Sequence, residues 1–163
     1  MALLCGGACA ALAGPGCSGS PGGPTISSKM SEQPAVSSVV STDILAREPV
    51  ANTAQVKHIL IGWKDLADAY QGRVDPRAAK RTKADAETEV RGLVKRLEGG
   101  ADFDEVMKES SEDTSSAASA RVFTVSPDAQ LVIEFRQLST RLKVGEIGVV
   151  QSDYGFHIIK RLE

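Results

Sequence analysis

The chain has 163 residues, of which 42% are hydrophobic and 25% are charged, and its formal net charge is −2. These proportions are typical of a globular protein with one ordinary domain and a tail. The charge balance excludes a protein whose whole surface binds nucleic acid, so no nucleic-acid partner is expected. No uncharged apolar run approaches the ~20 residues that a membrane-spanning helix needs.

The N-terminal third of the chain differs in composition from the rest. All three cysteines lie in the first 17 residues, and five of the seven prolines lie in residues 1–53. Residues 1–17 are small, apolar and uncharged, which predicts a secretory signal. They resemble the signal of a bacterial lipoprotein, with Cys17 as the lipidated residue and a possible membrane attachment. Residues 18–53 are rich in Ser, Gly and Pro and predict a flexible tether. A disordered tail is the alternative interpretation of the segment.

Residues 54–163 are expected to fold as one domain that begins with a strand and a helix. Residues 54–62 are rich in β-forming side chains and predict the strand. Asp75-Pro76 is a favourable helix start, because Asp caps a helix well and Pro suits its first turn. Apolar residues then recur at intervals of three and four up to Leu97, so a helix is expected to end at Gly99-Gly100.

A second helix is predicted directly after Asp102, which can cap it. Residues 110–120 are polar and predict a loop, and residues 120–125 predict a short strand. Ser126-Pro127 is expected to open a third helix. The apolar face of that helix is formed by Leu131, Phe135, Leu138 and Leu142.

The last predicted elements are two strands at residues 148–150 and 156–162, joined by a turn from Ser152 to Gly155. The element order is therefore β-α-α-β-α-β-β. This order predicts an α+β domain in which helices pack on a small antiparallel-type sheet of about four strands.

Several common functional motifs are absent from the sequence. It has no GxxxxGK[ST] phosphate loop, no CxxC or HExxH spacing, and no GxSxG nucleophile motif. Two histidines that lie far apart in the chain do not make a zinc site by themselves. No metal or cofactor is therefore expected.

Four segments resemble, in the same order, segments of the parvulin-type peptidyl-prolyl cis-trans isomerases. They are VKHILIG, GGADFDEVMKESSED, FRQLSTRLKVGEIG and DYGFHIIKRLE, and together they extend over about residues 54–163. No single segment is decisive, but four in this order with plausible spacing favour the family strongly. The resemblance implies the parvulin fold, an isomerase activity without a covalent intermediate, and proline-containing polypeptides as clients.

The resemblance also implies a set of catalytic residues. His58 and His157 match the two histidines that the family places on adjacent central strands. Ser152 matches the hydroxyl residue, usually Thr or Ser, that joins their hydrogen-bond network. Thr114 falls where parvulins usually carry Cys or Asp, and Asp113 is an off-register substitute for it.

A second set of residues matches the substrate-binding part of the family's site. Leu131 and Phe135 match the residues that line the proline pocket, and Phe123 falls at a further apolar position of that pocket. The family's glycine-rich GGDLG segment is missing, however, and SARVFT occupies its place. Because glycines allow a close backbone approach, the edge of the pocket is expected to differ.

A basic stretch follows the first predicted strand. Residues 63–83 carry six basic and three acidic side chains. In phosphorylation-dependent parvulins a basic loop in this place selects an acidic or phosphorylated residue before proline. Arg77 and Arg81 are therefore candidate substrate-binding residues, and an ordinary solvated surface is the alternative.

The sequence thus leads to three functional hypotheses. The first is a peptidyl-prolyl isomerase that assists protein folding in the bacterial cell envelope. The second is a parvulin-fold peptide-binding or holdase module with weak or no catalysis, which the missing glycine segment favours. The third is a cytoplasmic isomerase directed to phosphorylated or acidic X–Pro sites, which the basic stretch favours.

Overall fold

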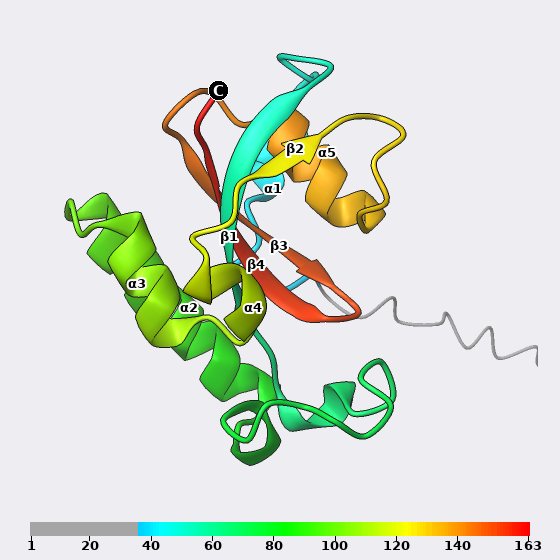
Figure 1. Cartoon of the computed structure of the whole chain (residues 1–163), viewed down its shortest axis with the longest axis vertical. Helices are drawn as coiled ribbons and strands as arrows, with labels where there is room; N and C mark the ends of the chain where they lie inside the picture. The colour runs from blue at the N-terminus through cyan, green and yellow to red at the C-terminus, as the bar shows by residue number, and fades with distance from the viewer. Residues whose placement is uncertain (1–35) are drawn as a thin grey trace, which may run out of the picture. The chain divides into compact units, whose positions relative to one another are not determined.

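The computed structural model describes residues 36–163, whose centre is one antiparallel four-stranded sheet (Figure 1). The strand order is β2-β1-β4-β3, which confirms the predicted α+β class and sheet size. The strands are β1 (Ala54–Ile61), β2 (Phe123–Val125), β3 (Ile147–Ser152) and β4 (Gly155–Arg161). The helices are α1 (Thr42–Leu45), α2 (Lys83–Glu98), α3 (Phe103–Ser110), α4 (Thr114–Ala118) and α5 (Ile133–Arg141), with short 3₁₀ turns η1 (Lys64–Leu66) and η2 (Ala78–Lys80).

The two central strands place the two histidines next to each other. In the β1–β4 pairing His58 lies opposite Ile159, and Leu60 lies opposite His157. The histidines are therefore diagonal neighbours, and because side chains alternate along a strand they point to the same face of the sheet.

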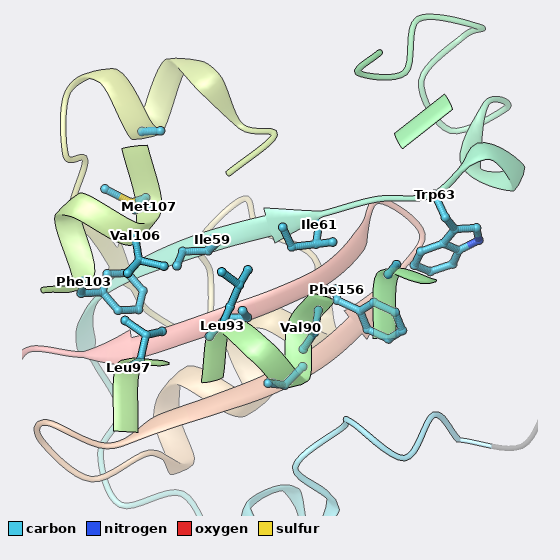
Figure 2. Close-up of a cluster of buried hydrophobic side chains, with 14 residues drawn as sticks. Ile59, Ile61, Trp63, Val90, Leu93, Leu97, Phe103, Val106, Met107 and Phe156 are labelled. Carbon is cyan, nitrogen blue, oxygen red and sulfur yellow. The ribbon is translucent and has the colours of Figure 1, made fainter. Parts of the chain in front are cut away.

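One face of the sheet is covered by α2 and α3. Their apolar side chains pack against those of β1 and β4 in a buried cluster that includes Ile59, Ile61, Leu93, Val106 and Phe156 (Figure 2). The cluster explains why apolar residues recur along α2, because each turn of that helix contributes one to the sheet. This face carries the main core of the domain.

The other face of the sheet carries α5 and the histidines. Phe135 and Leu138 of α5 pack against Val56 of β1 and Ile159 of β4 in a second buried cluster. His58 lies two residues after Val56, and His157 lies two residues before Ile159. Because alternate residues of a strand point to the same face, both histidines share this face and lie beside the part that α5 covers.

Residues 36–53 differ from the tether that the sequence predicted over residues 18–53. Ile44 of α1 is only 5% exposed and belongs to the cluster under α5. Ser41 exchanges two hydrogen bonds with the backbone of Val149, and the Arg47 guanidinium pairs with Glu146 at 2.8 Å. The described part of the predicted tether is therefore part of the domain, because it buries an apolar side chain and covers the edge strand β3.

The helix that follows β1 begins later than predicted. Asp75-Pro76 lies in a turn, and α2 begins after Thr82, which forms a capping box with Asp85. These two reciprocal hydrogen bonds satisfy backbone N–H groups at the start of α2. Asp75 does not cap a helix, because it forms an ion pair with Arg77 inside the preceding loop.

Two further helix predictions need correction. The predicted loop at residues 110–120 contains α4, which Asp113 caps by accepting a hydrogen bond from Ser116 N. The third helix begins at Ile133 and not at Ser126-Pro127, because the Ser126 hydroxyl bonds to Asp128 and turns the chain. Within residues 36–163 no helix is long and apolar enough to cross a membrane.

Candidate active site

The polar centre of the site is a line of four side chains, which we call the histidine network: Asp113, His58, His157 and Ser152. His58 Nε2 lies 3.1 Å from Asp113 Oδ2, and the two histidine Nδ1 atoms lie 3.2 Å apart. His157 Nε2 lies 2.8 Å from Ser152 Oγ. Both imidazoles are buried, with 5% of each residue exposed, so every ring nitrogen needs a partner and has one.

With both histidines neutral, one arrangement of protons satisfies the whole network. The Asp113 carboxylate only accepts, so His58 donates from Nε2 and accepts at Nδ1. His157 then donates from Nδ1 and accepts at Nε2 from the Ser152 hydroxyl. Ser152 Oγ in turn accepts from the backbone N–H of Tyr154 at 3.1 Å. The Asp113 carboxylate, which only accepts, and the backbone N–H of Tyr154, which only donates, thus fix the direction of the hydrogen bonds between them.

The electrostatics of the network keep its charge at Asp113. Burial lowers the pKa of His157 to about 3, and the repulsion that a proton on each of the two adjacent imidazoles would cause acts in the same direction, so His157 stays neutral at physiological pH. The hydrogen bond with His58 holds the pKa of Asp113 well below its usual range, against the opposing effect of burial. The network therefore combines a neutral histidine in its middle with a carboxylate at one end.

Two aromatic side chains surround the imidazoles. The His58 ring contacts Phe123 and Phe135 edge to face, with centroid distances of 5.1 and 5.3 Å. The His157 ring meets Phe135 in the same way at 5.6 Å. Phe135 is buried, whereas Phe123 and Leu131 are half-buried members of the same cluster. The three predicted pocket residues thus belong to one cluster, and Phe123 and Phe135 lie next to the histidines.

Of the two candidate residues at the end of the network, the structure brings Asp113 to His58, not Thr114. Thr114 lies in the first turn of α4 and lines a separate cavity of about 300 Å³ with Tyr70 and Glu112. The signal that could have identified Asp113 is its capping position: its side chain accepts from Ser116 N and Ser115 Oγ, which orients the second oxygen toward His58.

The structure also adds a tyrosine pair that the sequence analysis missed. The Tyr70 hydroxyl donates to the backbone oxygen of Tyr154 at 2.6 Å, and the two rings meet edge to face. Burial raises the pKa of Tyr70 to about 12. The loop after β1 is thus attached to the β3–β4 turn, which directly follows Ser152.

The two candidate arginines of the basic stretch are engaged in structural contacts. Arg77 pairs with Asp75 and donates to the backbone oxygens of residues 109–111. Arg81 pairs with Glu112 at 2.5 Å and with Glu89 at 2.7 Å, and its side chain is only 11% exposed. These partners fix the loop to α2 and to the segment before α4. The Arg81 guanidinium is buried by its partners, whereas the Arg77 side chain is 42% exposed but already pairs with Asp75.

The segment that replaces the expected glycines keeps a glycine-like backbone. Ala120 has a φ of 48°, in the left-handed region that favours glycine. The N–H of Ala120 bonds to Ala117 O and that of Arg121 to Ser116 O, which is the Schellman pattern at the end of a helix. The predicted lipidation site, Cys17, lies outside the described residues.

Comparison with known proteins places the chain beside bacterial folding factors. The foldase protein PrsA of Geobacillus kaustophilus is 32% identical over 108 residues, which make up 66% of this chain and 38% of that protein. The chaperone SurA of Ralstonia nicotianae is 42% identical over 112 residues, which make up 68% of this chain and 19% of that protein. The chain thus spans less than half the length of these two relatives.

Solved structures agree with the fold. The solution structure of TbPIN1 matches with a TM-score of 0.58 at 26% identity and covers 70% of this chain and 100% of that one. The peptidyl-prolyl isomerase ESS1 from Candida albicans matches with a TM-score of 0.56 at 20% identity, over 69% of this chain and 63% of that one. The family model described as a PPIC-type PPIASE domain matches residues 42–163. Since this match includes the whole sheet, both histidines and α5, the chain belongs to the PPIC-type, or parvulin, family of peptidyl-prolyl isomerase domains.

Proposed function

We propose that the chain is a peptidyl-prolyl cis-trans isomerase that rotates X–Pro bonds in polypeptide clients without a covalent intermediate. The observation that carries this proposal is the histidine network lying against Phe123 and Phe135. A polar line and an apolar surface meet there, in a chain that belongs to the parvulin family.

The reaction needs neither a nucleophile nor a metal. Rotation about an X–Pro bond is slow because amide resonance gives a barrier of ~18–20 kcal/mol. Twisting the bond removes that resonance and reduces the charge separation of the amide. A site accelerates the rotation if it binds the twisted bond better than either planar isomer. An apolar surface does this, because it solvates the charge-separated planar form poorly.

The roles of the side chains follow from their contacts. Phe123, Leu131 and Phe135 provide the apolar surface for the proline ring. Ser152 is held in the network, since its hydroxyl donates to His157 and its oxygen accepts from Tyr154 N–H. The histidine network holds the aromatic surface in place and gives the amide a polar border.

The two alternative functions have less support. The holdase hypothesis rests on the missing glycines, but Ala120 keeps the left-handed backbone that a glycine there favours. The hypothesis of a phospho-directed isomerase rests on Arg77 and Arg81, which both have structural partners.

The client class and the location are also part of the proposal. The names of two similar proteins, a foldase and a chaperone, support a role in protein folding. The signal-like segment at residues 1–17 supports export to the bacterial cell envelope, with Cys17 as a lipid anchor. Metabolic palmitate labelling of the wild type and of Cys17→Ser tests the anchor, and an unlabelled wild type contradicts it.

A protease-coupled assay with an Ala-Pro peptide tests the activity. Phe123→Ala is expected to lower kcat/KM by about tenfold or more, because Phe123 is the half-buried member of the aromatic pair and Phe135 is only 3% exposed. Val122→Ala is the matched control, since Val122 is the neighbouring residue and is already 41% exposed. Thermal melting of both variants separates lost activity from lost folding. A folded wild type without activity on any X–Pro peptide contradicts the proposal and favours the holdase.

A further inference from the structure

Arg121 lies at the edge of the apolar surface, at a place that the backbone fixes. Its N–H bonds to Ser116 O at the end of α4. Its guanidinium carbon lies 4.6 Å from the centre of the Phe123 ring. Stacking on an aromatic face limits the motion of an arginine side chain and suits its flat guanidinium. The cation is therefore held beside the ring that we assign to proline binding.

The guanidinium of Arg121 is available to a ligand. The residue is exposed, and it takes part in none of the ion pairs within 4.0 Å that residues 36–163 form. This distinguishes it from Arg77 and Arg81, whose carboxylate partners are already present.

Charges around the site make this position distinctive. The nearest charged member of the histidine network, Asp113, is committed to His58 and to the start of α4. An incoming anion is therefore repelled by Asp113 and attracted by Arg121. An anion gains from the contact where it lies close to Arg121 and away from Asp113, so the arrangement favours one position of the charge as well as one sign.

We propose that Arg121 forms an anion-binding subsite, which favours clients with a carboxylate or phosphate side chain adjacent to proline. This inference rests on the proposed isomerase function and names its preferred substrate class. Carboxylate and phosphate share the chemistry that a guanidinium recognises through paired N–H donors. The sequence-based prediction of an anion-reading loop thus moves from Arg77 and Arg81 to the segment after α4.

The expected preference is modest. An exposed ion pair contributes ~0–1 kcal/mol, so a single arginine gives roughly a fivefold higher kcat/KM for a Glu peptide than for its Gln counterpart. The preference is expected to shrink as salt is raised from low concentration to about 0.5 M, because the group is exposed to solvent.

The experiment measures kcat/KM for matched peptides with Glu, Gln, Lys or phospho-Ser placed before or after proline. Arg121→Gln is expected to remove the Glu-over-Gln preference, so that kcat/KM for the two peptides becomes equal. Arg121→Glu is expected to reverse the preference in favour of Lys. Arg91→Gln is the matched control: it removes the same charge from α2, which packs on the opposite face of the sheet. The phospho-Ser peptide shows whether a phosphate is preferred to a carboxylate.

Two outcomes overturn the inference. One is equal turnover of Glu and Gln peptides by an active wild type at low salt, and the other is a preference that survives Arg121→Gln. Both leave the proposed isomerase function intact. If the wild type turns over no peptide, the isomerase function fails. The subsite is then tested by titrating labelled forms of the Glu and Gln peptides into the protein and measuring Kd. Equal Kd values contradict the subsite. Tighter binding of the Glu peptide that Arg121→Gln abolishes supports it.

Discussion

Asp113 is the residue at which the geometry departs most from the sequence-based expectation for the site. Asp113→Asn is expected to cost about 1–3 kcal/mol of stability, because it removes a charged hydrogen-bond acceptor from the half-buried end of the histidine network. In this variant the side-chain amide presents either an N–H donor or a weaker, uncharged acceptor to His58, so kcat/KM is expected to fall about tenfold. Urea unfolding and the isomerase assay measure the two effects.

Thr114→Val serves as the control for this substitution. Thr114 lies in the first turn of α4, and its side chain is not among the hydrogen-bond partners of either histidine. Its replacement is expected to leave kcat/KM within about twofold of the wild-type value. A loss in Thr114→Val that matches the loss in Asp113→Asn contradicts the assignment of Asp113 to the network.

His157 gives the domain a pH-dependent stability whose sign follows from its environment. Its pKa is lowered from 6.5 to about 3, so the unfolded chain binds a proton at this residue at pH values where the folded chain does not. Stability is therefore expected to fall as pH drops through 6.5 toward 3. Between pH 7 and pH 5 the loss is about 2 kcal/mol.

Urea unfolding at pH 7, 6 and 5 measures this dependence. His157→Gln cannot titrate in this range, so it is expected to have a flatter pH profile whatever its overall stability. A wild type and a variant with parallel profiles between pH 7 and pH 5 contradict a buried, neutral His157.

At the scale of elements, α4 ends in a backbone conformation that its residue does not favour. Ala120 has a positive φ at the Schellman position, which costs an L-residue with a Cβ atom roughly 1–2 kcal/mol. Ala120→Gly is expected to raise stability by about 0.5–1 kcal/mol, after the greater chain entropy of glycine is subtracted. The urea midpoint measures the gain.

Ala118→Gly is the matched control, because Ala118 is an exposed residue in α4 itself. There the same change is expected to lower stability by about 0.5–1 kcal/mol. The change in unfolding free energy is therefore expected to have opposite signs in Ala120→Gly and Ala118→Gly. A loss of stability in both variants refutes the strain at Ala120.

The elements that the sequence predicted well are those specified by local pattern. The first strand was placed at residues 54–62, and β1 covers Ala54–Ile61, because a run of β-forming residues there is buried on both faces. The start of α2 was misplaced, because Asp75-Pro76 and Thr82 both carry capping signals and only tertiary contacts decide between them. One such contact is the pairing of Arg81 with Glu89 and Glu112, which fixes the loop before α2.

The site shows the same division between pattern and tertiary contact. The histidines, Ser152 and the aromatic residues follow from the resemblance, because each lies in a recognisable segment. The partner of His58 depends on a shift of one residue at the start of α4. The engagement of Arg77 depends on backbone oxygens of residues 109–111, which no local pattern indicates.

At the scale of the whole molecule, the segment before β1 is a structural part of the domain. Ile44 is 5% exposed and packs in the same cluster as Phe135. Gly148 of β3 leaves space for the Ile44 side chain, since a Cβ atom added at Gly148 lies 3.3 Å from Ile44 Cδ1. The segment thus supports α5 and the edge strand β3, and through α5 the aromatic surface beside the histidines.

Ile44→Ala is therefore expected to destabilise the full chain by about 2–4 kcal/mol, the usual range for removing a large buried aliphatic side chain. Val50→Ala is the control, because Val50 lies in the same segment but is 52% exposed, and it is expected to change stability by less than about 0.5 kcal/mol. Because Ile44 and Phe135 share a cluster, Ile44→Ala is also expected to raise KM more than it lowers kcat for proline peptides. Urea unfolding and steady-state kinetics measure both effects. An Ile44→Ala variant as stable as Val50→Ala restores the flexible tether that the composition of residues 18–53 suggested.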